Sequence, residues 1–216
     1  SESISVDLEE LALQIVHPTN LGLDLDTAAS IENVIGGNQD DTIRGNALVN
    51  RITGGPGNDE LYGRGASDIV VETRDANFIL TTTSLNIGTE VDLLDSRQRA
   101  ILTGGGANNT IDATAASGSV QLFGLVGNDL LFGGSGGDIL EGGAGNDDLF
   151  GGAGSDDYLF DTLQSLGSDE VFEYVGGGID DLLIDGLSVD LTDALTQVIS
   201  ANLTLTLPNL NVENAL

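Results

Sequence analysis

Cysteine, methionine, tryptophan and lysine are absent from this 216-residue chain, and histidine occurs once. Without cysteine the chain can form no disulfide, no thiolate zinc site and no cysteine nucleophile. The single histidine, His17, precedes Pro18 and has no second histidine for a His-Glu-x-x-His zinc protease site. The string GGSGG around Ser135 fits Gly-x-Ser-x-Gly, but it lies inside the glycine-rich repeats with no base nearby, so we do not interpret it as a hydrolase elbow. We therefore predict that the chain is not an enzyme.

Positive charge is scarce as well. Six arginines stand against 35 acidic residues, which gives a formal net charge of −29. Such a surface repels nucleic-acid phosphates and anionic lipids, so nucleic acid is not an expected partner. No apolar run approaches the ~20 residues that span a bilayer, so membrane insertion is not expected either. Acidic chains poor in aromatic residues are often disordered, but 40% of these residues are apolar. A folded chain neutralised by bound cations fits both observations.

Glycine is abundant, and much of it falls in nine-residue repeats of the form Gly-Gly-x-Gly-x-Asp-x-apolar-x. Residues 124–159 hold four consecutive copies: GLVGNDLLF, GGSGGDILE, GGAGNDDLF and GGAGSDDYL. Residues 36–71 hold a more degenerate block, whose repeats depart further from the consensus: GGNQDDTIR, GNALVNRIT, GGPGNDELY and GRGASDIVV. The next segment, ETRDANFIL, keeps only Asn77 in the sixth position and the apolar Ile79. The segment GGGANNTID (104–112) places Asn109 in the sixth position.

The nine-residue period predicts one turn and one very short strand per repeat. Glycine permits positive φ angles and close approach of neighbouring turns. Two repeats make an 18-residue coil, and successive coils would stack as parallel strands at ~4.8 Å. The fold class is therefore predicted to be all-β, a parallel β-solenoid. The residues expected to enter its core are Ile43, Ile52, Leu61, Val70, Leu131, Leu140, Leu149 and Tyr158.

The same stacking brings the aspartate of one turn onto the aspartate of the turn two repeats later. Two bare carboxylates at that spacing repel each other, and a column of them would destabilise the stack. A divalent cation between them reverses the sign, and glycine-rich turns add carbonyl oxygens. Oxygen-only ligands in flexible geometry favour Ca²⁺ over transition metals and over Mg²⁺. We interpret the repeat as a row of calcium ligands.

These motifs resemble the RTX (repeats-in-toxin) calcium-binding nonapeptide family, over roughly residues 36–80 and 104–184. The resemblance implies a right-handed parallel β-roll with several Ca²⁺ ions held between turns. Carried over by position, it implies the metal ligands Asp41, Asn50, Asp59, Asp68, Asn109, Asp129, Asp138, Asp147 and Asp156. The degenerate closing turns GSDEVFE and GGGIDDLLI add Asp169 and Asp180.

Four pairs are expected to share an ion: Asp41 with Asp59, Asn50 with Asp68, Asp129 with Asp147, and Asp138 with Asp156. Asn50 and Asn109 are neutral and weaker ligands, and asparagine also favours tight turns without any metal. Gln39 and Leu48 replace the fourth-position glycine in the first block. We therefore expect that block to bind fewer ions or to bind them more weakly.

A longer repeat overlies the short one. Val6-Asp7-Leu8 matches Val189-Asp190-Leu191 at an offset of 183 residues, and Ile31-Glu32-Asn33 matches Val212-Glu213-Asn214 at 181. The chain therefore reads as about one unit of a tandem array. Its predicted parts are a lead-in or cap (1–35), a first degenerate block (36–80), connecting strands (81–103), a second block with closing turns (104–184), and a cap or start of the next unit (185–216).

Two functional classes follow. The first is a calcium-binding structural module of a secreted or cell-surface protein that folds on binding extracellular calcium, in an adhesin-like array. Its expected partners are calcium ions, neighbouring units and an unidentified adhesion ligand. The alternative is a C-terminal export and folding module of a type I-secreted protease or lipase whose catalytic domain lies outside this chain. A sugar- or ice-binding face on Thr81–Thr83 is a third reading, which ordinary β-propensity of threonine explains better.

Overall fold

The computed structural model describes residues 3–8, 14–15, 22–23, 32–65, 67–95, 99–161, 167–172 and 178–185. All regular secondary structure in these ranges is β, and most strand pairs are parallel. The prediction of an all-β parallel solenoid is confirmed. In the described ranges there is no helix of the length and apolarity needed to span a membrane. All of the predicted segment 185–216 except its first residue, and most of the lead-in 1–35, lie outside the described residues.

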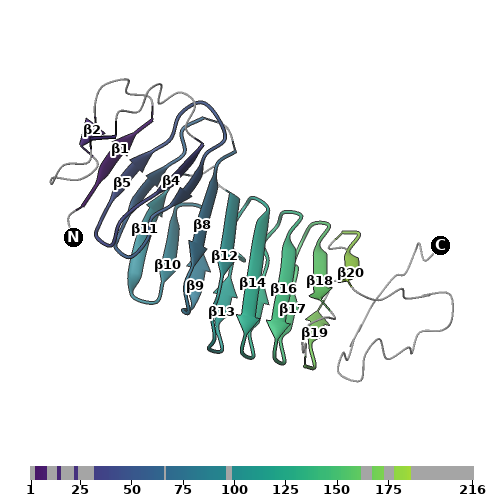
Figure 1. The fold of residues 1–216 in the computed structure, drawn as a ribbon. Coiled ribbons are helices and arrows are strands. Elements are labelled where there is room, and N and C mark those ends of the chain that lie inside the picture. Colours follow the sequence, from purple (N-terminus) through teal and green to yellow (C-terminus); the bar gives the residue numbers. More distant parts are fainter. Residues whose placement is uncertain are drawn as a thin grey trace.

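Two sheets face each other, and the chain passes from one to the other at nearly every turn (Figure 1). The first sheet is parallel throughout; in chain order it contains β4 (Asn33–Ile35), β6 (Arg51–Thr53), β8 (Ile69–Thr73), β12 (Arg99–Thr103), β14 (Val120–Val126), β16 (Ile139–Ala144), β18 (Asp157–Asp161) and β20 (Asp181–Asp185). A small separate pair joins β2 (Gln14–Ile15) to β3 (Gly22–Leu23).

The second sheet has ten strands in a different order. Its spatial order is β1 (Ser5–Asp7), β5 (Thr42–Arg44), β7 (Glu60–Tyr62), β11 (Glu90–Leu94), β10 (Ser84–Ile87), β9 (Phe78–Leu80), β13 (Thr110–Asp112), β15 (Leu130–Phe132), β17 (Asp148–Phe150) and β19 (Glu170–Phe172). Strands β9, β10 and β11 form an antiparallel meander inside this otherwise parallel sheet. We call Phe78–Leu94 the inserted meander.

The core lies between the sheets and is built from the middle residue of each short strand. Ile43 pairs in register with Leu61, and Leu131 pairs with Leu149. All eight predicted core residues are at most 2% exposed, which confirms that prediction: Ile43, Ile52, Leu61, Val70, Leu131, Leu140, Leu149 and Tyr158. Burying such a side chain stabilises the fold by ~1.5–3 kcal/mol. Because each coil buries only two of them, a single coil gains little on its own.

The inserted meander makes the two sheets unequal. Three of its strands separate β7 from β13 in one sheet, whereas β8 and β12 are direct neighbours in the other. A regular coil would place one strand there, so two extra strands add roughly 10 Å to one side of the stack. The strands of the first coils are accordingly inclined to those of the later coils (Figure 1).

The nonapeptide register ends at this insertion. The register that placed Ile79 as the apolar strand residue is wrong, because Ile79 is 49% exposed while Phe78 and Leu80 are buried. Phe78 pairs with Ile111 of the next coil, so β9 presents Phe78 to the core. The segment from Glu72 to Asn77 contains no glycine, and its different turn brings the strand in one residue earlier.

Candidate calcium-binding ladders

The sixth-position residues of successive coils are joined by a repeated hydrogen bond. The backbone N–H of one residue donates to Oδ1 of the aspartate one coil later, which we call the carboxylate ladder. All four pairs predicted to share an ion lie together in this way: Asp41 N to Asp59 at 2.8 Å, Asn50 N to Asp68 at 2.8 Å, Asp129 N to Asp147 at 2.7 Å and Asp138 N to Asp156 at 2.8 Å.

The ladder continues beyond those pairs at both ends. Asn109 N donates to Asp129, Asp147 N donates to Asp169, and Asp156 N donates to Asp180. Asp169 and Asp180, assigned from degenerate closing turns, therefore occupy the same structural position as the regular repeats. At the N-terminal side, Ile4 N donates to Asp41. The ladder is thus part of the backbone hydrogen bonding that holds coils together.

The second oxygen of many ladder carboxylates is buried with no hydrogen-bond partner in the described part of the chain. These oxygens are Oδ2 of Asp59, Asp92, Asp129, Asp147 and Asp156. A buried carboxylate oxygen without a partner is costly, because burial removes its water and nothing replaces it. Each such oxygen is therefore positioned for a cation.

The glycines of the repeats leave room around these oxygens and bring carbonyl groups to the same place. A Cβ on Gly124 would lie 2.3 Å from Asp129 Oδ2 and 2.5 Å from the carbonyl oxygen of Gly142. A Cβ on Gly36 would likewise meet both Asp41 Oδ2 and the Gly54 carbonyl oxygen. Glycine at the first position thus keeps open a space that a carboxylate and the next coil's carbonyl share.

Burial makes the ladder carboxylates weak acids. It raises the pKa of Asp59, Asp147 and Asp156 to about 6 and that of Asp169 to about 7. Backbone hydrogen bonds oppose the shift, while neighbouring ladder carboxylates add to it. Burial also raises the pKa of Asp68, Asp129 and Asp138. Stacked carboxylates without a cation therefore hold protons into the near-neutral range.

Oxygen ligands, flexible turns and excess negative charge together fit Ca²⁺. Within the described ranges, no three acidic or histidine side chains gather closely enough to hold a metal by themselves. Backbone carbonyls would therefore have to supply part of each coordination sphere, and the first-position glycines place such carbonyls beside the carboxylates. Metal ligation by the ladder residues stays a prediction.

Asn50 and Asn109 occupy ladder positions but already have turn-forming roles. The side-chain oxygen of Asn50 accepts from Asn46 N, and that of Asn109 accepts from Gly105 N, both at 2.8 Å. The other predicted ligands are buried except Asp180, which is half-buried.

A second ladder, missed in the sequence analysis, runs through the fifth position in the opposite direction. Asn128 N donates to Asn108 Oδ1, and Asn146 N donates to Asn128 Oδ1, both at 2.9 Å. Asn58 N donates to Asp40 Oδ1 in the first block. The recurrent Asn at the fifth position is the sequence feature that could have predicted this second ladder. A turn that carries both ladders, such as the turn of Asn128 and Asp129, is bonded to the turn before it and to the turn after it.

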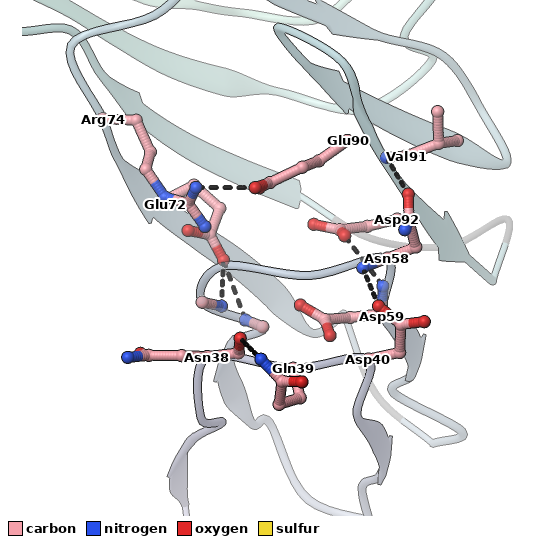
Figure 2. Close-up of polar contacts among 12 residues, drawn as sticks. Asn38, Gln39, Asp40, Asn58, Asp59, Glu72, Arg74, Glu90, Val91 and Asp92 are labelled. Atoms are coloured by element: carbon pink, nitrogen blue, oxygen red, sulfur yellow. Dashed lines mark hydrogen bonds and ion pairs between the residues drawn. The ribbon is translucent and has the colours of Figure 1, made fainter. Parts of the chain in front are cut away.

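The sequence motifs did not indicate the acidic group that lies where the first block meets the inserted meander (Figure 2). Asp92 lies outside any nonapeptide, yet Asp59 N donates to its Oδ1 at 3.0 Å. Glu72 stands where the repeat has its first glycine, and its carboxylate is buried. Arg74 forms a 2.8 Å ion pair with Glu90. No periodic pattern identifies these residues, because the next carboxylate of the ladder comes from the meander and not from a nonapeptide repeat.

One of three comparisons with known proteins, the comparison with family models, agrees with the repeat pattern. The family model for the RTX calcium-binding nonapeptide repeat matches four copies, within residues 28–47, 45–71 and 123–158. No curated protein sequence matches the chain. Among solved structures, the chain is similar to the extracellular lipase LipA from Serratia marcescens, at 18% identity with a TM-score of 0.41. That match covers 83% of this chain and 38% of the lipase.

Proposed function

Because this chain carries RTX calcium-binding nonapeptide repeats, we propose that it is a calcium-conditional structural module of a secreted or cell-surface protein. The observation that carries the proposal is the column of buried carboxylates between stacked coils, whose Oδ2 atoms have no hydrogen-bond partner among the residues that the structure describes. Bound calcium supplies the positive charge that such a column needs. The chain's own residues place the carboxylates, by backbone hydrogen bonding, and the carbonyls, by glycine turns.

Under this proposal, folding of the chain is coupled to calcium binding. Without calcium the ladder carboxylates repel each other, and the short strands bury too little to offset the loss of chain entropy. With calcium, binding free energy becomes folding free energy. Affinities of ~10⁻⁴–10⁻³ M, as for extracellular modules, would keep the chain unfolded during type I export and fold it outside the cell.

A place in an adhesin-like tandem array is supported by the role of the first strand. Val6 and Leu8 are buried, and β1 pairs with β5 of the first block. In the sequence, Val189 and Leu191 match these two residues. The alternative is an export module of a secreted enzyme, which RTX repeats also suit. Further copies of the ~180-residue unit in the parent sequence would favour the array; an upstream catalytic domain would favour the alternative.

The test of the proposal is a calcium titration followed by far-ultraviolet circular dichroism, with magnesium as the control cation. We expect a β signal that appears cooperatively with calcium and only weakly with magnesium. A full β signal in excess chelator at neutral pH would refute calcium-conditional folding.

A further inference from the structure

The inserted meander contributes a carboxylate to the ladder of the first block. Asp92 on β11 accepts a hydrogen bond from Asp59 N, as Asp59 accepts one from Asp41 N. Asp59 and Asp92 are 1% and 0% exposed, and Oδ2 of each is buried without a hydrogen-bond partner among the described residues. Figure 2 shows their carboxylates on neighbouring segments. A strand of the inserted meander, β11, which pairs parallel with β7, has thus replaced a repeat at this point of the column.

A third buried carboxylate adds to the negative charge. Glu72 is 2% exposed and accepts hydrogen bonds from the N–H groups of Gly54 (2.8 Å) and Gly55 (3.3 Å). It therefore fixes the turn that carries Asp59. Burial raises the pKa of Asp92 to about 7, and the charges of Asp59 and Glu72 add to the shift.

Arg74, the nearby arginine, balances little of the negative charge of these three carboxylates. Arg74 pairs with Glu90, at 2.8 Å, and the described ion pairs include none between Arg74 and Asp59, Glu72 or Asp92. Its positive charge lowers the pKa of Asp59 and Asp92 only as the smallest of the contributions acting on each. Burying unpaired carboxylates is costly, so a second source of positive charge is needed.

We propose that a calcium ion bound between Asp59 and Asp92 fastens the inserted meander to the first repeat block. The inference rests on the proposed function, but one of the two ligands that it assigns, Asp92, lies outside the matched repeats, which end at residue 71 in this block. Asp59 and Asp92 supply two carboxylates to the site. Glu72 is a positioning residue that orders the Gly54–Gly55 turn. The meander is then ordered by calcium together with the repeats.

The test uses the whole chain with the substitution Asp92→Asn, which keeps an oxygen to accept the Asp59 N–H and removes the charge. Asp40→Asn is the matched control, because Asp40 is exposed, lies in the same column of turns and loses the same charge. Equilibrium dialysis with calcium counts the bound ions. Amide hydrogen exchange with and without calcium reports on Glu90–Leu94.

We expect the Asp92→Asn variant to bind one ion fewer than the wild type and the control, and to lose calcium-dependent protection in β11 while β15 and β17 keep theirs. An unchanged ion count with full protection of β11 would overturn the site and leave the proposed function standing. A wild-type chain that binds no calcium would instead refute the proposed function and this site with it. If the Asp92→Asn variant fails to fold in saturating calcium, Asp92→Glu should fold with one weakened site; unchanged affinities at all sites would then overturn the inference.

Discussion

The backbone N–H of Asp129 donates a 2.7 Å hydrogen bond to Oδ1 of Asp147, whose Oδ2 is buried without a partner in the described chain. The two oxygens of one carboxylate therefore have separate tasks. Oδ1 joins consecutive coils, and Oδ2 is available to a cation. Asp147 N in turn donates to Asp169, so Asp147 lies in the middle of its column.

Replacing Asp147 with alanine should damage calcium-dependent folding more than replacing Asp41. Asp147→Ala leaves the buried Asp129 N–H without an acceptor, at a cost of ~1–3 kcal/mol, and also removes a predicted ligand shared by two coils. Asp41 lies at the end of its column, and its partners Ile4 N and Gly37 N are only partly buried, so water can replace the lost bonds. Calcium titrations of both variants by circular dichroism measure the difference. Equal midpoints would contradict the position-dependent role.

The first-position glycines should be intolerant of a methyl group. A Cβ on Gly142 would lie 2.3 Å from Asp147 Oδ2, so Gly142→Ala must displace the carboxylate. We expect a loss of ~1–3 kcal/mol, typical of overpacking, and a higher calcium midpoint. Gly106→Ala is the control, because nothing lies within 4 Å of its Cβ. Similar midpoints for the two variants would show that the space beside Asp147 is not required.

The outer face of the second sheet carries a stack of phenylalanines whose central member should matter most. The ring centroids of Phe132 and Phe150 are 4.7 Å apart, and those of Phe150 and Phe172 are 4.4 Å apart. Each stacked pair contributes ~0.5–1.5 kcal/mol beyond area burial. Phe150→Leu breaks two pairs and Phe132→Leu breaks one. Urea unfolding in saturating calcium should therefore show the larger loss for Phe150→Leu, and equal losses would argue against ring stacking.

Sequence was sufficient wherever the nine-residue period holds. Leu131, Leu140 and Leu149 could be placed in the core because each follows its glycine turn at a fixed distance. The same period paired Asp129 with Asp147 and Asp138 with Asp156. A stacked coil makes such positions predictable, since one local rule is repeated with nearly the same neighbours.

Sequence was insufficient at the inserted meander, where contacts are set by sheet pairing. Asp92 joins the column because β11 pairs with β7 in a register that places Leu94 opposite Leu61, which no local motif encodes. Ile79 was assigned to the wrong register because the turn from Glu72 to Asn77 lacks glycine. Glu72 appeared only as an eroded consensus position, although its buried side chain orders the preceding turn.

The raised pKa values of the buried carboxylates predict that protons partly replace calcium. In the folded chain burial raises the pKa of Asp59, Asp147 and Asp156 to about 6, and that of Asp92 and Asp169 to about 7, against ~3.9 for an unfolded aspartate. Because the folded state binds protons more tightly, calcium-free stability is greatest below pH ~4 and falls as pH rises through 6 to 7. Above pH 7 the full cost of the charged columns opposes folding.

Circular dichroism in chelator should therefore show more β structure at pH 5 than at pH 7.5, and the signal should disappear between them. Calcium titrations at the two pH values should give the higher midpoint for calcium binding at pH 5, because protons compete with calcium for the same carboxylates. Replacing Asp147 and Asp169 together by asparagine removes two of the groups with raised pKa, so that variant should show a shallower pH dependence in chelator. A calcium-free signal that does not change between pH 5 and 7.5 would mean that the carboxylates of the carboxylate ladder do not control folding.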